Sequence, residues 1–305
     1  MRQRFAIAIA ALAGGAWLQF APLDEIGPAQ FDRAIDLPAN RSNSGGFSGV
    51  EVSENGAVFL AISDRGYVLR GRLLRADGHL AGVQTDPVRP LLTTGGTPVR
   101  GKGNDAEGAA LAPDGTLYVS FEGQNRILSY AAGKPVAQRR FTSDLFVSFP
   151  SNGGMEALAI DAAGTLYALP ERIWRRRQPT PVYRLDAQGW TALPGYARNR
   201  GFLPVGADVG PDRRLYILER HFKGLGFASR IRSYAIGPDA LYDPLIILTT
   251  RQGRHGNLEG LSVWRDGQGA IRLTMVSDDN FLPVLPNQVV EYVVPKILAN
   301  KGAKD

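Results

Sequence analysis

The chain of 305 residues contains no cysteine. A disulfide framework, a thiolate metal site and a cysteine nucleophile are therefore excluded. No His-Glu-x-x-His, P-loop or EF-hand motif occurs either. The serine of Gly45–Gly49 (GGFSG) stands one residue late for the G-x-S-x-G elbow of a serine hydrolase, and no strand-to-helix context surrounds it. A Ser-His-Asp arrangement therefore cannot be identified in this chain.

Sustained helical spacing of apolar residues is also absent, which excludes helical repeats of the TPR or HEAT type. Only one long apolar run occurs, from Phe5 to Phe20, and it follows the basic start Met1–Arg4. This run is short for a membrane span. We therefore expect residues 1–21 to be a cleaved secretory signal rather than an uncleaved anchor. The mature chain is then expected in the periplasm or secreted, and meets a membrane only if the leader is retained.

Charge gives little indication of a macromolecular partner. The net charge of +6 is modest and lies partly in the leader. The basic cluster Arg172–Arg177 (RIWRRR) could meet an anionic partner, but we interpret it as a solvated loop. No nucleic-acid partner is expected, and we expect a monomer that acts on a small anionic or ester substrate.

What the chain does contain is a repeated β unit, clearest from Asn104 to Tyr130. Two short strands, Gly108–Ala112 and Thr116–Phe121, are predicted on either side of the turn Pro113–Gly115. Proline presets φ and glycine accepts positive φ, so these residues favour a tight turn. A third strand is predicted at Arg126–Tyr130.

Four further copies of this unit begin at Phe47, Met155, Val205 and Leu258. Aligned on the last apolar residue of the first strand, the copies lie 59, 49, 49 and 54 residues apart. Such a period with several strands per copy is typical of β-propeller blades. We predict an all-β propeller forming a single domain over residues 22–305. Five blades follow from the repeat count; six stay open, because the first interval is the longest and Thr93–Lys102 could hide strands.

A strand at Phe31–Leu37 precedes the first copy, and another at Gln288–Val294 follows the last. Propellers often complete the last blade with a strand from the opposite terminus, which removes an unpaired edge. We expect these two segments to pair and close the ring.

Acidic residues recur in phase with the repeat. Innermost propeller strands all run in one direction, so the residue entering each first strand and the residue leaving each second strand meet at one end of the channel. The first position predicts an inner set of Glu107, Glu156 and Glu259, while Ser48 and Val205 take its place in the other copies. The second position adds Asp64, Glu122, Glu171, Glu219 and Asp278, with Asp279 as an alternative to the last. Converging carboxylates suit Ca²⁺ or Mg²⁺, and we favour Ca²⁺.

Other side chains near these acids are candidates for further roles. His255, just before Glu259, could ligate a softer metal or act as a base. Arg65, Arg220 and Arg254 flank the acids and could hold an anionic substrate group. The structural alternative is that each acid caps backbone N–H groups or pairs with an arginine of the next blade.

The motifs GGFSGVEV and AISDRG, NDAEGAALAPDGTLYVSFE, MEALAIDAAGTLYALPE, and NLEGLSV with VSDDN resemble those of the phytase-like (esterase-like) family of exported bacterial propellers. The resemblance spans Phe31 to Val294. It implies a β-propeller that hydrolyses an ester, including phosphoric esters. It also places the acids at matching motif positions: Glu107, Glu156, Glu259, Asp64 and Asp278. The consecutive aspartates before Pro-Ala of the calcium-dependent propeller phytases do not occur here.

We therefore expect a metal-dependent ester hydrolase. The metal would polarise the ester, one of Glu107, Glu156 or Glu259 would act as general base, and Arg65 or Arg254 would steady the anion. Two alternatives stay open. The first is a non-catalytic binding propeller with a structural cation, and the second is a metal-dependent sugar lactonase of the six-bladed type.

Overall fold

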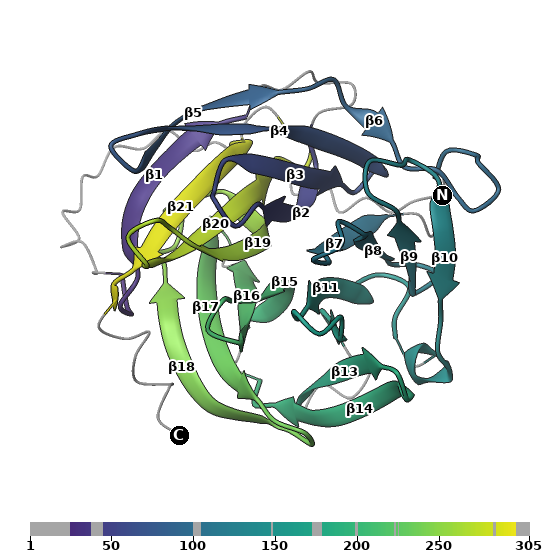
Figure 1. The fold of residues 1–305 in the computed structure, drawn as a ribbon. Helices are drawn as coiled ribbons and strands as arrows, with labels where there is room; N and C mark the ends of the chain where they lie inside the picture. The colour runs from purple at the N-terminus through teal and green to yellow at the C-terminus, as the bar shows by residue number, and fades with distance from the viewer. Residues whose placement is uncertain are drawn as a thin grey trace.

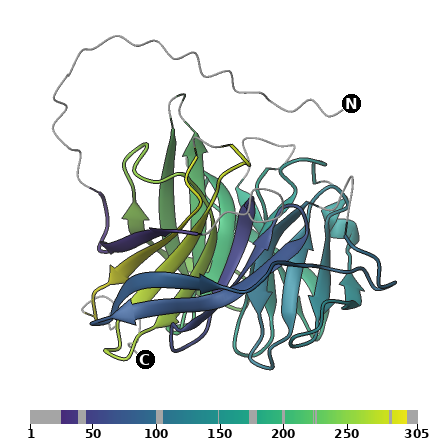
Figure 2. The same cartoon turned by 90° about the horizontal axis from the view of Figure 1, so that it is seen from above.

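In the computed structural model of the protein, the described residues are 25–37, 45–99, 105–147, 149–172, 179–198, 201–222, 224, 226–282 and 285–296. Five antiparallel sheets surround one axis, and their first strands pack in a ring (Figure 1). Seen from the side, the sheets form a disc with two faces (Figure 2). The protein is a five-bladed β-propeller, as the repeat count predicted; the six-blade alternative is wrong.

Each blade begins at the channel and runs outward. The innermost strands are β2 (Phe47–Val52), β7 (Ala106–Leu111), β11 (Met155–Ile160), β15 (Leu203–Val209) and β19 (Asn257–Arg265). The second strands are β3 (Val58–Ser63), β8 (Leu117–Phe121), β12 (Leu166–Pro170), β16 (Arg214–Phe222) and β20 (Ile271–Asp278).

The outer half of each blade consists of two more strands. The third strands are β4 (Tyr67–Ala76), β9 (Arg126–Tyr130), β13 (Thr180–Asp186), β17 (Phe227–Ile236) and β21 (Gln288–Val294). The outermost strands are β5 (His79–Thr85), β10 (Ala137–Phe141), β14 (Gly189–Tyr196), β18 (Leu241–Thr249) and β1 (Gln30–Asp36). A short strand, β6 (Arg89–Pro90), pairs with β4, and one 3₁₀ turn, η1, covers Asp144–Phe146.

The ring closes as predicted: β1, from the N-terminal side, pairs antiparallel with β21 of the last blade. Ion pairs tie this closure to the first blade. Arg75 of β4 donates to both oxygens of the fully buried Glu291 of β21, at 2.7 and 2.9 Å. Arg272 of β20 pairs with Asp32 of β1 at 2.9 Å. The closing strand is therefore held by charge as well as by its backbone ladder.

The hydrophobic core is divided into five clusters, each between two neighbouring blades. Between the first two blades, for example, Leu60 and Ile62 pack with Val119 and Phe121. Burial of one such side chain stabilises the fold by about 1.5–3 kcal/mol. The recurring tyrosines lie in or against these layers: Tyr118, Tyr167 and Tyr216. The propeller is thus held together by contacts between blades.

The outer strand of the first blade is β5, because the chain turns at Asp77 and Gly78, both with positive φ, and runs straight back along β4. The predicted leader, residues 1–21, lies outside the described residues. Within the described residues, no helix has the length and apolar character needed to cross a membrane.

Candidate functional site

Every innermost strand is irregular at the position of the recurring acid. The pairing register with the second strand shifts between Phe47 and Gly49, and a shift recurs at the equivalent place in the other four blades. The residue at the irregularity is Ser48, Glu107, Glu156, Val205 or Glu259. A bulge of this kind re-aims a side chain out of the regular alternation. Five aligned bulges therefore explain how one position of the repeat is directed to the channel.

The glycine that follows the acid has a packing role. A Cβ atom on Gly108 would lie 2.5 Å from the carbonyl oxygen of Glu156 in the next blade. Gly206 lies against the carbonyl of Glu259 in the same way. At this position of the repeat the residue at the bulge is followed by a glycine, after Glu107 in one blade and after Val205 in another. The missing side chain lets the backbone of the next blade approach closely.

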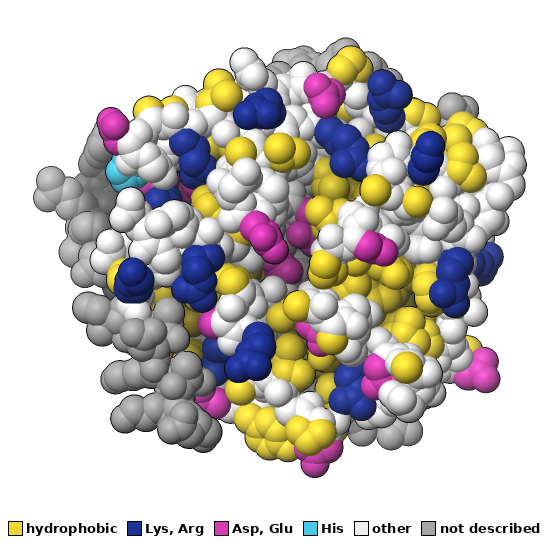
Figure 3. Space-filling model, viewed as in Figure 1, with side chains coloured by type: hydrophobic (Ala, Val, Ile, Leu, Met, Phe, Trp, Pro, Cys, Tyr) yellow, Lys and Arg dark blue, Asp and Glu magenta, His cyan; other side chains and the backbone are white. Residues whose placement is uncertain are grey.

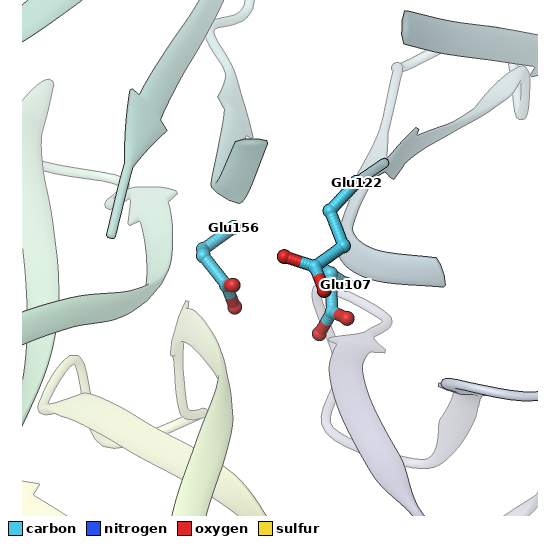
Figure 4. A group of neighbouring side chains, drawn as sticks. All are labelled: Glu107, Glu122 and Glu156. Atoms are coloured by element: carbon cyan, nitrogen blue, oxygen red, sulfur yellow. The ribbon is translucent and has the colours of Figure 1, made fainter. Parts of the chain in front are cut away.

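Three of the predicted acids come together. Glu107 of β7, Glu122 after β8 and Glu156 of β11 each offer a carboxylate oxygen within 4.8 Å of the other two. We call Glu107, Glu122 and Glu156 the carboxylate trio; Figure 4 shows them converging from two neighbouring blades. Among the described residues, none of the three forms an ion pair with lysine or arginine. Glu122 accepts hydrogen bonds from the N–H groups of Gly153 (2.7 Å) and Gly154 (3.3 Å).

This arrangement favours protons or a cation. Burial raises the pKa of Glu107, and the charges of Glu156 and Glu122 raise it further. The pKa of Glu156 is raised by burial and then by Glu171 and Glu122. Glu122 also has a raised pKa, because burial outweighs its two backbone hydrogen bonds. Carboxylates this close repel one another when ionised, and a divalent cation would remove that repulsion.

The other side of the channel is neutralised by an arginine. Arg220 of β16 donates to Glu259 and lies 3.1 Å from an oxygen of Glu171. Asn257 donates to Glu259 at 2.7 Å and to Asp278 at 3.3 Å. Glu171 and Glu259, unlike the carboxylate trio, therefore have an arginine as counter-charge among the described residues.

The predicted placement of Glu219 is corrected by the strand pairing. Pro204 pairs with Glu219, just as Phe47 pairs with Ser63 in the first blade, so the counterpart of Asp64 is Arg220. Successive side chains of a strand face opposite sides, so a one-residue slip moves a side chain to the other face. Glu219 is 1% exposed and binds Arg230 and Arg232 at 2.7 and 2.5 Å. It therefore does not belong to the channel set.

Two further candidates lie elsewhere. His255 contacts the hydroxyl of Tyr292 at 2.7 Å, and its ring lies against Phe31, so it faces the outer strands β21 and β1. Burial lowers the pKa of His255 to about 4. Arg254 pairs with Glu25 at 3.3 Å and lies over the Phe31 ring. These contacts place both residues away from the carboxylates, as part of the outer packing of the last blade.

Asp64 and Arg65 lie beside the acids of the channel. Burial, together with Glu259 and Asp105, raises the pKa of Asp64 to about 7, although Arg65 opposes the shift. The Oδ1 atom of Asp64 is buried and accepts no hydrogen bond from any residue that the structure describes. The Arg65 guanidinium stacks over Phe281, 3.2 Å from the ring centroid. Phe281 itself has φ of 54°, a conformation rare for a bulky residue.

Sequence reasoning missed two members of the site. Asp105 raises the pKa of both Asp64 and Glu122 through its charge. Asn257 bridges Glu259 and Asp278. Each stands two residues before an inner acid of the repeat. A polar residue at this position in two of the five copies was therefore the sequence feature that could have identified them.

The family of the chain follows from its sequence. The profile of the family described as "Phytase-like: Esterase-like activity of phytase" matches residues 42–281. The chain belongs to this family. The matched region contains the carboxylate trio, Asp64 and Arg220. The family description and the propeller fold together support a hydrolase with esterase-like activity.

Solved structures resemble this phytase-like chain at low identity, and no curated protein matches it in sequence. Virginiamycin B lyase from Staphylococcus aureus is 12% identical, with a TM-score of 0.42, over 85% of this chain and 72% of that one. The PQQ-bound aldose sugar dehydrogenase from Streptomyces coelicolor is 15% identical, with a TM-score of 0.41, over 85% and 82%. U3-55K is 11% identical, with a TM-score of 0.46, over 88% and 100%. These likenesses concern the fold alone.

Proposed function

We propose that this member of the phytase-like family is an exported, metal-dependent ester hydrolase that holds a divalent cation, Ca²⁺ by preference, at the carboxylate trio. The observation that carries the proposal is an asymmetry of charge. Arg220 forms ion pairs with Glu259 and Glu171, whereas Glu107, Glu122 and Glu156 converge within 4.8 Å and form no ion pair with a described lysine or arginine, although Arg220 acts on Glu156 at longer range.

The residues present fit the cation. They offer only oxygen donors, which Ca²⁺ and Mg²⁺ prefer over nitrogen and sulfur. Asp64 lies beside this set without belonging to it, and its buried Oδ1 atom accepts no hydrogen bond from the described residues. When bound, the cation supplies Lewis acidity toward an ester oxygen.

Asp64 is the residue best suited to accept a proton. Its pKa of about 7 keeps it partly ionised near neutrality, where a general base works most efficiently. Glu259, by contrast, is engaged by Arg220 and Asn257, so it is a weaker choice than the sequence indicated. Arg65, next to Asp64 and exposed, is the candidate for steadying an anionic substrate group.

The substrate class proposed is a small carboxylic or phosphoric ester. The family description names esterase-like activity, and a cation with a flanking arginine suits an ester that bears or develops negative charge. The apolar run after a basic N-terminus supports export as a cleaved protein to the periplasm or the medium.

The test combines cation binding with turnover. The purified chain is treated with EDTA, titrated with Ca²⁺, Mg²⁺ and Mn²⁺ by calorimetry, and assayed on p-nitrophenyl acyl esters, a phosphomonoester and a lactone. We expect hydrolysis of an ester to require the cation. Glu107→Gln and Glu156→Gln should each lower both cation affinity and turnover at least tenfold. Glu54→Gln, at an exposed position on the opposite face, is the matched control.

The outcomes separate the competing functions. Cation binding without turnover of any substrate would replace the hydrolase with a binding propeller that has a structural ion. Turnover of the lactone alone would make the protein a lactonase. If no cation bound to the parent chain, or if the two variants bound it as well as the parent, the metal site itself would be wrong.

A further inference from the structure

A cavity opens at the end of the channel opposite the carboxylate trio, on the face that carries the turns between first and second strands. Its volume is about 950 Å³. Residues from the ends of all five innermost strands line it, and each contributes one aliphatic side chain at the same position of the repeat: Val52, Leu111, Ile160, Val209 and Val263. These five residues form the aliphatic collar of the cavity. Because the collar is apolar, it favours the apolar part of an organic ligand.

Two acids lie next to the collar. Glu51 and Asp208 occupy the equivalent position, one residue before the collar, on β2 and β15, which are not neighbours in the ring. Only 7% of Glu51 and 8% of Asp208 is exposed. Figure 3 shows acidic side chains gathered at the centre of this face, with lysine and arginine side chains farther out. The centre of the cavity is therefore acidic. Burial and the charge of Asp208 raise the pKa of Glu51, and burial raises the pKa of Asp208 to about 7, so a cation bound between them would favour their ionised forms.

The hydrogen bonds of these acids explain their position but leave acceptor capacity unused. The N–H of Leu111 donates to Oε1 of Glu51 at 3.2 Å, and the N–H of Val263 donates to Oδ2 of Asp208 at 2.6 Å. Ser262, at the same repeat position, accepts from Val52. These three side chains each fasten one blade to the next. Within the described residues, no hydrogen bond to Oε2 of Glu51 is found, and neither acid forms an ion pair with lysine or arginine.

We propose that this cavity binds an organic ammonium ion, with the charged group at Glu51 and Asp208 and the alkyl part against the aliphatic collar. A small hydrated metal ion would not suit a ring of five aliphatic side chains, because the collar offers no oxygen to replace lost water. A neutral apolar ligand would fill the collar but would make no use of the two acids, which burial then keeps protonated. An alkylammonium ion meets both demands. The site is separate from the carboxylate trio and does not depend on the proposed hydrolase activity.

The probe is n-butylammonium chloride, compared with n-butanol and sodium chloride, by calorimetry and thermal denaturation of the whole chain. Glu51→Gln and Asp208→Asn retain an amide oxygen for the Leu111 and Val263 N–H groups, so the blade contacts persist. We expect each variant to weaken butylammonium binding at least tenfold. Glu156→Gln, in the carboxylate trio, should leave it unchanged.

Three results would overturn the proposal. The first is equal binding of butanol and butylammonium, which would make the cavity a purely apolar site. The second is butylammonium affinity that stays the same in folded Glu51→Gln and Asp208→Asn variants. The third is loss of binding in Glu156→Gln, which would place the ligand at the other end of the channel. Circular dichroism of each variant establishes that it is folded, so that loss of binding is not mistaken for unfolding.

Discussion

Glu219 and Arg220 are adjacent in the chain, yet they serve opposite sides of β16. Glu219 is buried against Arg230 and Arg232 of β17, whereas Arg220 reaches across to Glu171 and Glu259 in the two neighbouring blades. This alternation converts a ring of repeated acids into a ring with one arginine. The candidate site consequently consists of the acids with which Arg220 forms no ion pair.

Glu219→Gln should lower stability without changing cation binding. The substitution leaves two buried arginines without their carboxylate, and breaking a buried pair in this way costs about 3–5 kcal/mol. Urea denaturation measures the loss, and calorimetry with Ca²⁺ measures the affinity. Glu122→Gln, at the corresponding end of β8, is the comparison and should lower the Ca²⁺ affinity. An equal loss of affinity in both variants would show that Glu219 shares the site after all.

Arg220→Gln should destabilise the metal-free protein and increase its response to Ca²⁺. Removing the guanidinium leaves Glu259 buried without a counter-charge and Glu171 with only the exposed Arg172, at a cost of about 3 kcal/mol. A cation would then compensate more repulsion than in the parent protein, so saturating Ca²⁺ should raise the melting temperature further. The exposed Arg213→Gln is the control and should change stability by less than about 0.5 kcal/mol. A smaller Ca²⁺ response in Arg220→Gln than in the parent would contradict this account.

The EDTA-treated protein should lose stability as the pH rises toward 8. Burial and neighbouring charge raise the pKa of Asp64 from 3.8 to about 7, and the pKa values of Glu107, Glu156 and Asp278 also lie above their ordinary range. A raised folded-state pKa gives stability that is complete below about pH 4 and is lost as the pH passes through about 7.

Melting temperatures at pH 5, 6, 7 and 8, with EDTA or Ca²⁺, check this prediction. Asp64→Asn should flatten the decline, because the amide does not ionise. Ca²⁺ should restore stability at pH 8 and have little effect at pH 5, where protons already occupy the carboxylates. A melting temperature that is independent of pH in EDTA would mean that the acids are not mutually repelling.

Gly108→Ala should destabilise the fold although it adds one methyl group. That methyl would lie 2.5 Å from the Glu156 carbonyl oxygen, and such overpacking typically costs about 1–3 kcal/mol. Gly267→Ala is the matched control, since its methyl would meet nothing within 4 Å. Denaturation with urea compares the two variants. Equal stability of both would show that the glycine after the acid has no part in blade packing.

The repeat, the number of blades and the closing strand pair could be read from the sequence. Each depends on local signals that recur at a fixed interval: the turn Pro113–Gly115, alternating apolar residues and the final strand Gln288–Val294. The inner acids Glu107, Glu156 and Glu259 could likewise be identified, because one position of each copy must face the same end of the channel. Symmetry of the chain is sufficient for these conclusions.

Pairing register and long-range ion pairs were decided only by the tertiary structure. Whether Glu219 or Arg220 faces the channel depends on a one-residue difference in ladder pairing, which the local sequence does not specify because both residues follow the same apolar run. The pairing of Glu259 with Arg220 joins residues 39 positions apart, and the contact of His255 with Tyr292 joins residues 37 positions apart. A repeat determines which positions are equivalent, but charge compensation depends on which neighbours the closed ring brings within a few ångströms.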